Sequence, residues 1–343
     1  MRSYPTAKVT ETVEALIKKL AEAWGPPGFE HQIRDLIRGE VEPVADEITV
    51  DPLGNLICRV GNGATRVMTA AHMDEIGLIV GHIDRQGYAR FASIGTLFPA
   101  TLLGARVRFE NGVIGTIGVE HQYSKRRELP ALSGFYIDIS QDAGSNADIR
   151  VGDPAAFVGD VIRRGDRVIG KGLDNRVGCA IQIEAMRRVK AQGTPHSIYF
   201  AFTVQEEVGT RGAGPAAHNV APDVAIAIDA TATGDLPHGK EMAVTLGGGA
   251  AIKARDAGLI VPAPLKALMI RRAEDAGIPY QLEVLEAAST DGKAIQIARS
   301  GVPTGAISFP LRYTHTASET ADRRDIQAAA DLLVAILTQE IAL

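Results

Sequence analysis

The sequence is short of several kinds of residue, and each shortage excludes a class of protein. Its two cysteines, Cys58 and Cys179, stand far apart in apolar segments, so no disulfide framework is expected and both should be buried free thiols. No stretch approaches the roughly 20 apolar residues of a membrane-spanning helix, and the N-terminus lacks the apolar core of a signal peptide. We therefore expect a cytoplasmic protein with no membrane partner.

Positive charge is scarce as well. Acidic side chains outnumber basic ones by 41 to 36, giving a net charge of −5, and this mild acidity argues against a nucleic-acid partner. The chain is otherwise typical of a soluble α/β protein, with 45% hydrophobic residues and 36 glycines. Its 343 residues exceed what one hydrophobic core usually serves, so two domains are expected.

The pattern along the chain predicts an α/β domain that is interrupted by an all-β domain. Apolar residues recur at helical spacing from Val13 to Trp24, and a second helix is expected at 30–40. The hairpin strands DEITV and NLICRV follow, and then a strand, TRVMTAA, that ends at His72. From about 77 to 164 the chain consists of short β-rich runs punctuated by glycine, which is typical of a barrel or sandwich.

Strand and helix patterns alternate again after this segment. The predicted strands are SIYFAFTV, DVAIAID and PTGAISF, and the predicted helices are AIQIEAMRRV, PLKALMIRRAEDAG, DGKAIQIARSG and residues 323–340. The predicted division is therefore an α/β domain of residues 1–76 plus 165–343 and an inserted β domain of residues 77–164.

Several polar residues stand where apolar stretches end. His72 and Asp74 follow a strand at positions i and i+2, which puts both side chains on one side of an extended backbone. Such a histidine can bind a metal through one ring nitrogen, while the carboxylate accepts the other N–H and fixes the tautomer. A polar strand end in a loop is the alternative interpretation.

Two aspartates also have structural alternatives. Asp174, in GKGLDNRVG, precedes a helix, and taken alone it is best explained as the N-cap. Asp229 ends the strand DVAIAID, where it could form an Asx-turn. The carboxyl ends of strands in an open α/β sheet are, however, also where ligands bind.

Two adjacent glutamates, Glu206 and Glu207, end the strand SIYFAFTV. A buried strand gains nothing from two neighbouring negative charges, so a cation is the expected partner. Consecutive strand residues point to opposite faces, so both can reach one site only if the chain bends, which Gly209 and Gly212 would permit. His315, in SFPLRYTHTASE, follows another strand, and an ordinary loop residue is its alternative interpretation.

Together these residues favour a metal centre. Two histidines with several carboxylates suit Zn²⁺ or a similar divalent ion, and the lack of cysteine ligands disfavours a structural zinc site. Five ligands and a spare carboxylate exceed what one ion needs and predict two ions. The other histidines stand in polar or helical contexts or in the β insert and are treated as background: His31, His82, His121, His196, His218 and His238.

Five motifs in a fixed order give the chain a specific resemblance: AHMDEIG, GLDNRVG, QEEVGTRGA, IAIDAT and RYTHTASE. They resemble the co-catalytic dinuclear metallo-aminopeptidases, the group of glutamyl and deblocking aminopeptidases and tetrahedral (TET) peptidases, of which some have been labelled endoglucanases. The resemblance extends from GPPGFE near the start to the final helix. It implies a zinc-peptidase-like mixed sheet flanked by helices, an inserted barrel-like dimerisation domain, and homo-oligomers in which dimers form dodecamers.

The resemblance also implies a role for each candidate metal ligand. Asp174 would bridge two divalent ions, with Zn²⁺ expected and Co²⁺ or Mn²⁺ as alternatives. His72 and Asp229 would complete one metal position, and Glu207 and His315 would complete the other.

The two remaining candidates are expected to be catalytic without binding metal. Glu206 would be the general base that moves a proton from a metal-bridged water to the leaving amine. Asp74 would orient His72. The expected activity is that of a metallopeptidase, a hydrolase that removes N-terminal residues from peptides with a free N-terminus.

Departures from the family pattern touch none of these ligands, and two other hydrolase classes are alternatives. Ala250 stands in the place of a proline, Thr316 replaces the serine after the last histidine, and IDISQD replaces Ile-Asp-Ile-Gly. A related di-metal amidase or carboxypeptidase would use the same chemistry, but with a mixed α/β insert. An endoglucanase-type glycosidase would not need the two histidines, and one tryptophan with 5% aromatic residues gives little material for a sugar cleft.

Overall fold

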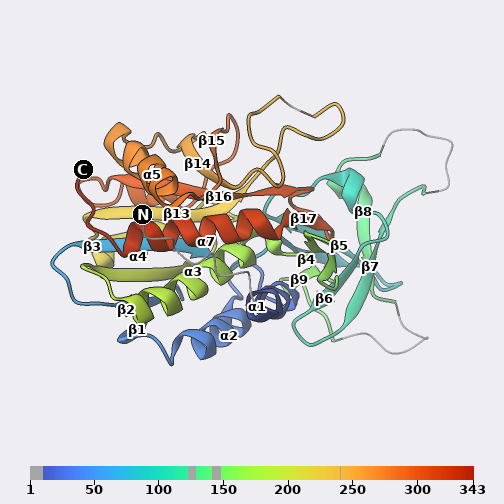
Figure 1. Cartoon of the computed structure of the whole chain (residues 1–343). Coiled ribbons are helices and arrows are strands. Elements are labelled where there is room, and N and C mark those ends of the chain that lie inside the picture. The colour runs from blue at the N-terminus through green and yellow to red at the C-terminus, as the bar shows by residue number, and fades with distance from the viewer. Residues whose placement is uncertain (1–10, 123–128, 141–147, 240) are drawn as a thin grey trace.

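The computed structural model describes residues 11–122, 129–140, 148–239 and 241–343. Figure 1 shows its two parts, an eleven-stranded mixed sheet with flanking helices and a closed barrel of six strands. This architecture confirms the predicted α/β fold with an inserted barrel-like domain. Within the described ranges, no helix is long and apolar enough to cross a membrane.

Four parallel strands form the centre of the large sheet. In spatial order they are β12 (Ser197–Thr203), β3 (Arg66–His72), β13 (Val224–Thr231) and β16 (Thr304–Arg312). Almost all of their residues are buried because helices cover both faces, which explains their continuous apolar runs. The strands are parallel, so their carboxyl ends meet at one edge of the sheet, where Thr203 pairs with His72.

Shorter strands extend this sheet. They are β1 (Glu47–Val50), β2 (Leu56–Val60), β10 (Ile162–Arg164), β11 (Arg167–Gly170), β14 (Ala250–Arg255), β15 (Tyr280–Val284) and β17 (Glu319–Asp322). The hairpin of β1 and β2 adds to β12, and β17, β11 and β10 follow β16 on the other side. β14 pairs with β16 and with β15, and only the pairing of β14 with β15 is parallel among these outer strands.

Helices cover both faces of the large sheet. They are α1 (Glu11–Glu22), α2 (His31–Val41), α3 (Leu173–Gln192), α4 (Ala213–Val220), α5 (Ala263–Ala276), α6 (Gly292–Gln296) and α7 (Arg323–Leu337). Apolar residues of α1, α2, α3, α5 and α7 share one core with the sheet, and those of α4 and α6 form a second core on its other face. Figure 1 shows α3 and α7 packed side by side along one face of the sheet.

The inserted barrel has its own apolar core. Its strands are β4 (Gly77–Ile83), β5 (Tyr88–Ile94), β6 (Arg106–Phe109), β7 (Ile114–Val119), β8 (Phe135–Asp138) and β9 (Pro154–Phe157), with 3-10 helices η1 (Pro99–Thr101) and η2 (Leu132–Gly134). The barrel closes in the order β4, β5, β8, β7, β6, β9. Along β6 and β7, inward side chains such as Val107 and Ile117 alternate with more exposed ones, as is typical of a barrel.

The end of the predicted insertion does not lie in this barrel. Residues 162–164, which the sequence prediction assigned to the β domain, form β10 and pair with β11 across a tight turn. Gly165 makes that turn with a φ of 62°, a conformation that glycine adopts without strain. The last barrel strand ends at Phe157, so the boundary at 164 includes a strand of the large sheet.

Most other predicted elements are confirmed within a few residues, and both cysteines are buried and free. The helix predicted in DGKAIQIARSG is short, because α6 ends at Gln296 and the backbone of Ile297 (φ −96°, ψ 4°) already leaves the helical conformation. The sequence does not predict β14 and β15. Each of these strands carries a fully buried charged residue, Lys253 and Glu283, which form an ion pair with each other and break the apolar pattern.

Candidate metal centre

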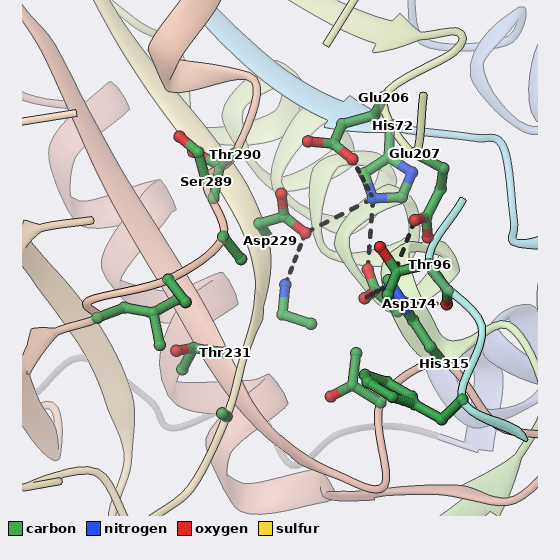
Figure 2. Close-up of a pocket in the computed structure, with 17 residues that line it drawn as sticks. His72, Thr96, Asp174, Glu206, Glu207, Asp229, Thr231, Ser289, Thr290 and His315 are labelled. Atoms are coloured by element: carbon green, nitrogen blue, oxygen red, sulfur yellow. Dashed lines mark hydrogen bonds and ion pairs between the residues drawn. The ribbon is translucent and has the colours of Figure 1, made fainter. Parts of the chain in front are cut away.

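A cavity of about 530 Å³ lies at the edge where the four parallel strands end. Figure 2 shows six of the seven sequence-predicted site residues converging on it: His72, Asp174, Glu206, Glu207, Asp229 and His315. The seventh, Asp74, is fully buried beside His72. The six predicted residues come from the ends of β3, β12 and β13, from the start of α3 and from the loop between β16 and β17.

Asp174 lies between the two histidines. Its Oδ1 is 3.3 Å from Nε2 of His72, and its Oδ2 is 3.7 Å from Nε2 of His315. The N-cap of α3 is Gly172, and the backbone of Asp174 is extended (ψ 106°) although it lies within the first turn. The alternative interpretation of Asp174 as the N-cap is therefore wrong. Its carboxylate is directed into the cavity.

Each histidine also faces a further carboxylate. Nε2 of His72 is 3.6 Å from Oδ1 of Asp229 and 4.0 Å from Oε2 of Glu206. Nε2 of His315 is 3.2 Å from Oε2 of Glu207. Glu206 therefore faces His72 at the longest of these distances, whereas Glu207 faces His315 at the shortest. The two adjacent glutamates thus occupy different positions within one cavity.

Main-chain carbonyl groups orient both rings. Nδ1 of His72 is 3.2 Å from the carbonyl oxygen of Asp74, and Nδ1 of His315 is 2.9 Å from that of Thr96. When Nδ1 donates its proton to the carbonyl, Nε2 is free to act as a ligand toward the cavity. The sequence predicted that the Asp74 carboxylate would accept the His72 N–H, but its Oδ1 is 3.6 Å away and the carbonyl is the closer acceptor.

The carboxylate of Asp74 instead holds the glutamate doublet. Its two oxygens accept the backbone N–H groups of Glu206 and Glu207 at 3.0 and 3.1 Å. Glu30 accepts the N–H of the preceding Gln205 at 3.2 Å, and Gln205 has a left-handed backbone with a φ of 56°. The chain thus bends just before the doublet, which brings both glutamates to the cavity.

Three buried carboxylates without a predicted role surround the site: Glu30, Asp291 and Glu319. Glu319 accepts the N–H of Asp174 at 3.0 Å and that of His315 at 2.9 Å, so it joins two of the segments that reach the cavity. Asp291 accepts a hydrogen bond from the hydroxyl of Thr203. Of these three carboxylates, only Glu319 had a signal in the sequence that could have revealed it, namely its position four residues after His315.

A buried ion pair lies behind the cavity. The ammonium of Lys171 donates to both carboxylate oxygens of Glu75, at 2.9 and 2.7 Å, and the guanidinium of Arg176 lies 3.5 Å from the same carboxylate. Glu75 follows His72 by three residues, and Lys171 precedes Asp174 by three. The pair therefore connects two segments that meet at the cavity.

We expect Lys171→Met to lower the free energy of unfolding by about 3–5 kcal/mol, because Glu75 would keep a buried charge without its ammonium partner. Lys190→Met removes an ion pair with Asp46 whose side chains are much more exposed, and should cost at most about 1 kcal/mol. Urea unfolding followed by circular dichroism compares the two variants. Equal, small losses would show that Arg176 alone neutralises Glu75.

The electrostatics of the cavity are those of a cation site. Burial lowers the pKa of His72, but the three surrounding aspartates outweigh it and hold that pKa well above its ordinary value. Burial likewise lowers the pKa of His315, but Glu207 raises it to about 10. Both rings thus lie among concentrated negative charge, which a divalent cation would neutralise.

Two buried oxygen atoms of the cluster, Oδ1 of Asp174 and Oε1 of Glu207, have no hydrogen-bond donor among the described residues. Buried carboxylate oxygens are normally paired with a donor or a metal ion. Ligand atoms of His72, Asp174 and Glu207 all lie within 4.8 Å of one another. This mixture of imidazole and carboxylate donors suits Zn²⁺ and similar ions, so the residues fit a divalent metal.

Comparison with known proteins finds relatives among peptidases. The family model described as M42 glutamyl aminopeptidase matches residues 54–332. The chain is 45% identical to a putative aminopeptidase of Acetivibrio thermocellus, over 93% of this chain and 96% of that protein. It resembles the structure of an aminopeptidase from the archaeon Desulfurococcus kamchatkensis, with a TM-score of 0.90, 34% identity and coverage of 95% and 94% of the two chains. It also resembles the TET1 peptidase of Pyrococcus horikoshii, which can assemble into a tetrahedron or a large octahedral shell (TM-score 0.85, 32% identity, coverage 96% and 100%).

Proposed function

The chain belongs to the M42 glutamyl aminopeptidase family, and from that premise we propose that it removes N-terminal residues from peptides with the help of two divalent metal ions. The observation that carries the proposal is the position of Asp174. Its two carboxylate oxygens face the Nε2 atoms of different histidines, His72 and His315. A carboxylate in this position can be shared between two ions.

In this proposal each ion has two further protein ligands. His72 and Asp229 would complete one position, and Glu207 and His315 would complete the other, with Asp174 shared. Zn²⁺ is the proposed ion because imidazole and carboxylate ligands without cysteine suit catalytic zinc, and the same ligands accept Co²⁺ or Mn²⁺. When bound, the ions supply a water of lowered pKa and polarise the peptide carbonyl.

Glu206 is proposed as the general base. Its carboxyl is buried, and burial, supported by the charges of Asp229 and Asp291, raises its pKa well above the ordinary value. It would take a proton from the attacking water and deliver it to the leaving amine. Asp74 and Glu30 support this role because they hold the turn that presents Glu206 to the cavity.

We extend the proposal to assembly and location. Since a related TET peptidase forms multi-subunit shells, this chain is proposed to form a homo-oligomer built from dimers, up to a dodecamer. The inserted barrel, residues 77–157, would supply the dimer contacts, and exposed apolar side chains such as Ile114 and Val151 support this assignment. The buried free thiols agree with a location in the cytoplasm.

Two matched peptides test the proposed activity, Leu-Ala-Ala-Phe with a free N-terminus and the same peptide with an acetylated one. In the presence of Zn²⁺, Co²⁺ or Mn²⁺ we expect release of leucine from the free peptide alone, because the free amine is part of what the site recognises. Mass spectrometry of the products measures this. Release of phenylalanine from the acetylated peptide would point to the carboxypeptidase alternative instead.

A further inference from the structure

The wall of the cavity indicates which N-terminal side chains the site accepts. Building on the proposed aminopeptidase function, we propose that the cavity rejects acidic N-terminal residues and accepts neutral residues of the same size. Three features of the wall carry this inference: its residue types, the direction of its hydroxyl groups, and the charges directly behind it.

Away from the metal cluster, the described residues that line the cavity have no charged side chain. Phe98, Leu285 and several alanines supply the apolar part, and hydroxyl groups come from residues such as Thr231, Ser289 and Thr290. Figure 2 shows these three hydroxyl residues on the side of the cavity away from His315. A carboxylate in this part of the cavity would find no cationic partner among the lining residues, and a desolvated charge without a partner is costly.

Two of these hydroxyl groups point their hydrogen atoms away from the cavity. Thr231 donates to Oε1 of Glu283 at 2.8 Å, and Ser289 donates to Oδ1 of Asp256 at 2.9 Å. A hydroxyl has a single hydrogen, so toward the cavity both groups offer lone pairs only. Lone pairs accept a hydrogen bond from an amide group but repel a carboxylate. The hydroxyl of Thr290 accepts from the backbone N–H of Gly292 at 3.2 Å, which leaves its own hydrogen available. A neutral hydroxyl donor of this kind is a poor match for a full negative charge.

The acceptors of those two hydroxyl groups belong to a buried charge cluster. Lys253 forms an ion pair with Glu283 and lies 3.7 Å from Oδ2 of Asp256, and all three side chains are fully buried. The cluster contains one ammonium group and two carboxylates, so it carries a net charge of −1. The protein interior screens this charge only weakly. Lys293, whose side chain runs close to Gly258, is exposed and does not line the cavity. The potential at the wall is therefore unfavourable for an acidic side chain.

Glutaminyl and glutamyl p-nitroanilides test the inference on the metal-loaded enzyme, because they differ only by an amide in place of a carboxylate. We expect kcat/KM for the glutaminyl substrate to exceed that for the glutamyl substrate by at least about tenfold. Equal values, or a faster glutamyl substrate, would overturn the inference. If neither substrate nor leucyl p-nitroanilide is hydrolysed, it is the proposed function that fails.

Asp256→Asn tests the physical cause. The change removes one negative charge but keeps an oxygen that can accept from the hydroxyl of Ser289 and from the N–H groups of Gly258 and Leu259. The ratio of kcat/KM for the glutaminyl substrate to that for the glutamyl substrate should fall by about threefold or more. Glu47→Gln makes the same change in net charge at an exposed position on β1 and should leave the preference unchanged. Identical ratios in the two variants would overturn the role of the buried charge.

Discussion

Replacing Glu206 with glutamine is expected to lower kcat by about 10²–10⁴-fold while the protein keeps its metal ions. Glutamine has nearly the same shape but cannot take a proton from water. The carboxylate of Glu206 approaches the histidine rings less closely than the other cavity carboxylates, at 4.0 Å from Nε2 of His72, so its loss should disturb metal binding least. A fall in kcat with little change in KM would identify an interaction made in the transition state.

Steady-state kinetics together with metal analysis of the purified variant measure this effect. The matched control is Glu207→Gln, the same chemical change one residue along the chain. Because Oε2 of Glu207 lies 3.2 Å from Nε2 of His315, this control should lose metal as well as activity. A Glu206→Gln enzyme with both ions bound and near-normal turnover would remove Glu206 from the mechanism.

Asp174→Asn should weaken the binding of both ions and abolish activity. Loss of an outer partner of a metal ligand typically costs about 10–100-fold in affinity, so loss of an anionic ligand shared by two ions should cost more than about 100-fold. The geometry gives the reason, since the two oxygens of Asp174 face different histidines and an asparagine offers one neutral oxygen in their place.

Thermal unfolding in the presence of increasing Zn²⁺ or Co²⁺ measures this effect without reference to activity. An ion that binds only the folded state stabilises it in proportion to the logarithm of its concentration over Kd, so the wild type should gain stability where Asp174→Asn does not. Asp229→Asn is the matched control and should weaken one of two binding steps. Two binding steps of normal affinity in Asp174→Asn would contradict the shared-ligand assignment.

The residues that gather at the cavity could be predicted because most of them interrupt an apolar pattern at a strand end. His72 ends β3, Asp229 lies near the end of β13, and the glutamate doublet follows β12. Parallel strands bring their carboxyl ends to one edge of the sheet whatever the details of side-chain packing. The sequence pattern alone therefore indicates which side chains share a neighbourhood.

The carboxylates that support the site could not be predicted in this way. Glu30 accepts a hydrogen bond from Gln205, 175 residues away, and Glu319 accepts one from Asp174, 145 residues away. Such contacts depend on how loops meet after the core has formed, and a glutamate destined for burial has no local signature that separates it from a surface glutamate. For the same reason β14 and β15 could not be predicted. Their buried Lys253 and Glu283 form an ion pair between the two strands, which neither strand's own sequence reveals.

The contact between Thr96 and His315 has a consequence for how freely the inserted barrel can be exchanged. Thr96 lies in the insertion just after β5, yet its carbonyl group orients a ring of the candidate metal centre. The adjacent Gly95 (φ 79°) lies so close to Glu207 that a side chain added there would meet its carboxylate at about 3.2 Å. A barrel grafted from a relative would therefore have to reproduce this one loop to within a few tenths of an ångström. The outer surface of the barrel can therefore change to suit new subunit arrangements. The segment at Gly95 and Thr96, which faces the cavity, has to stay the same for as long as the candidate metal ligands do.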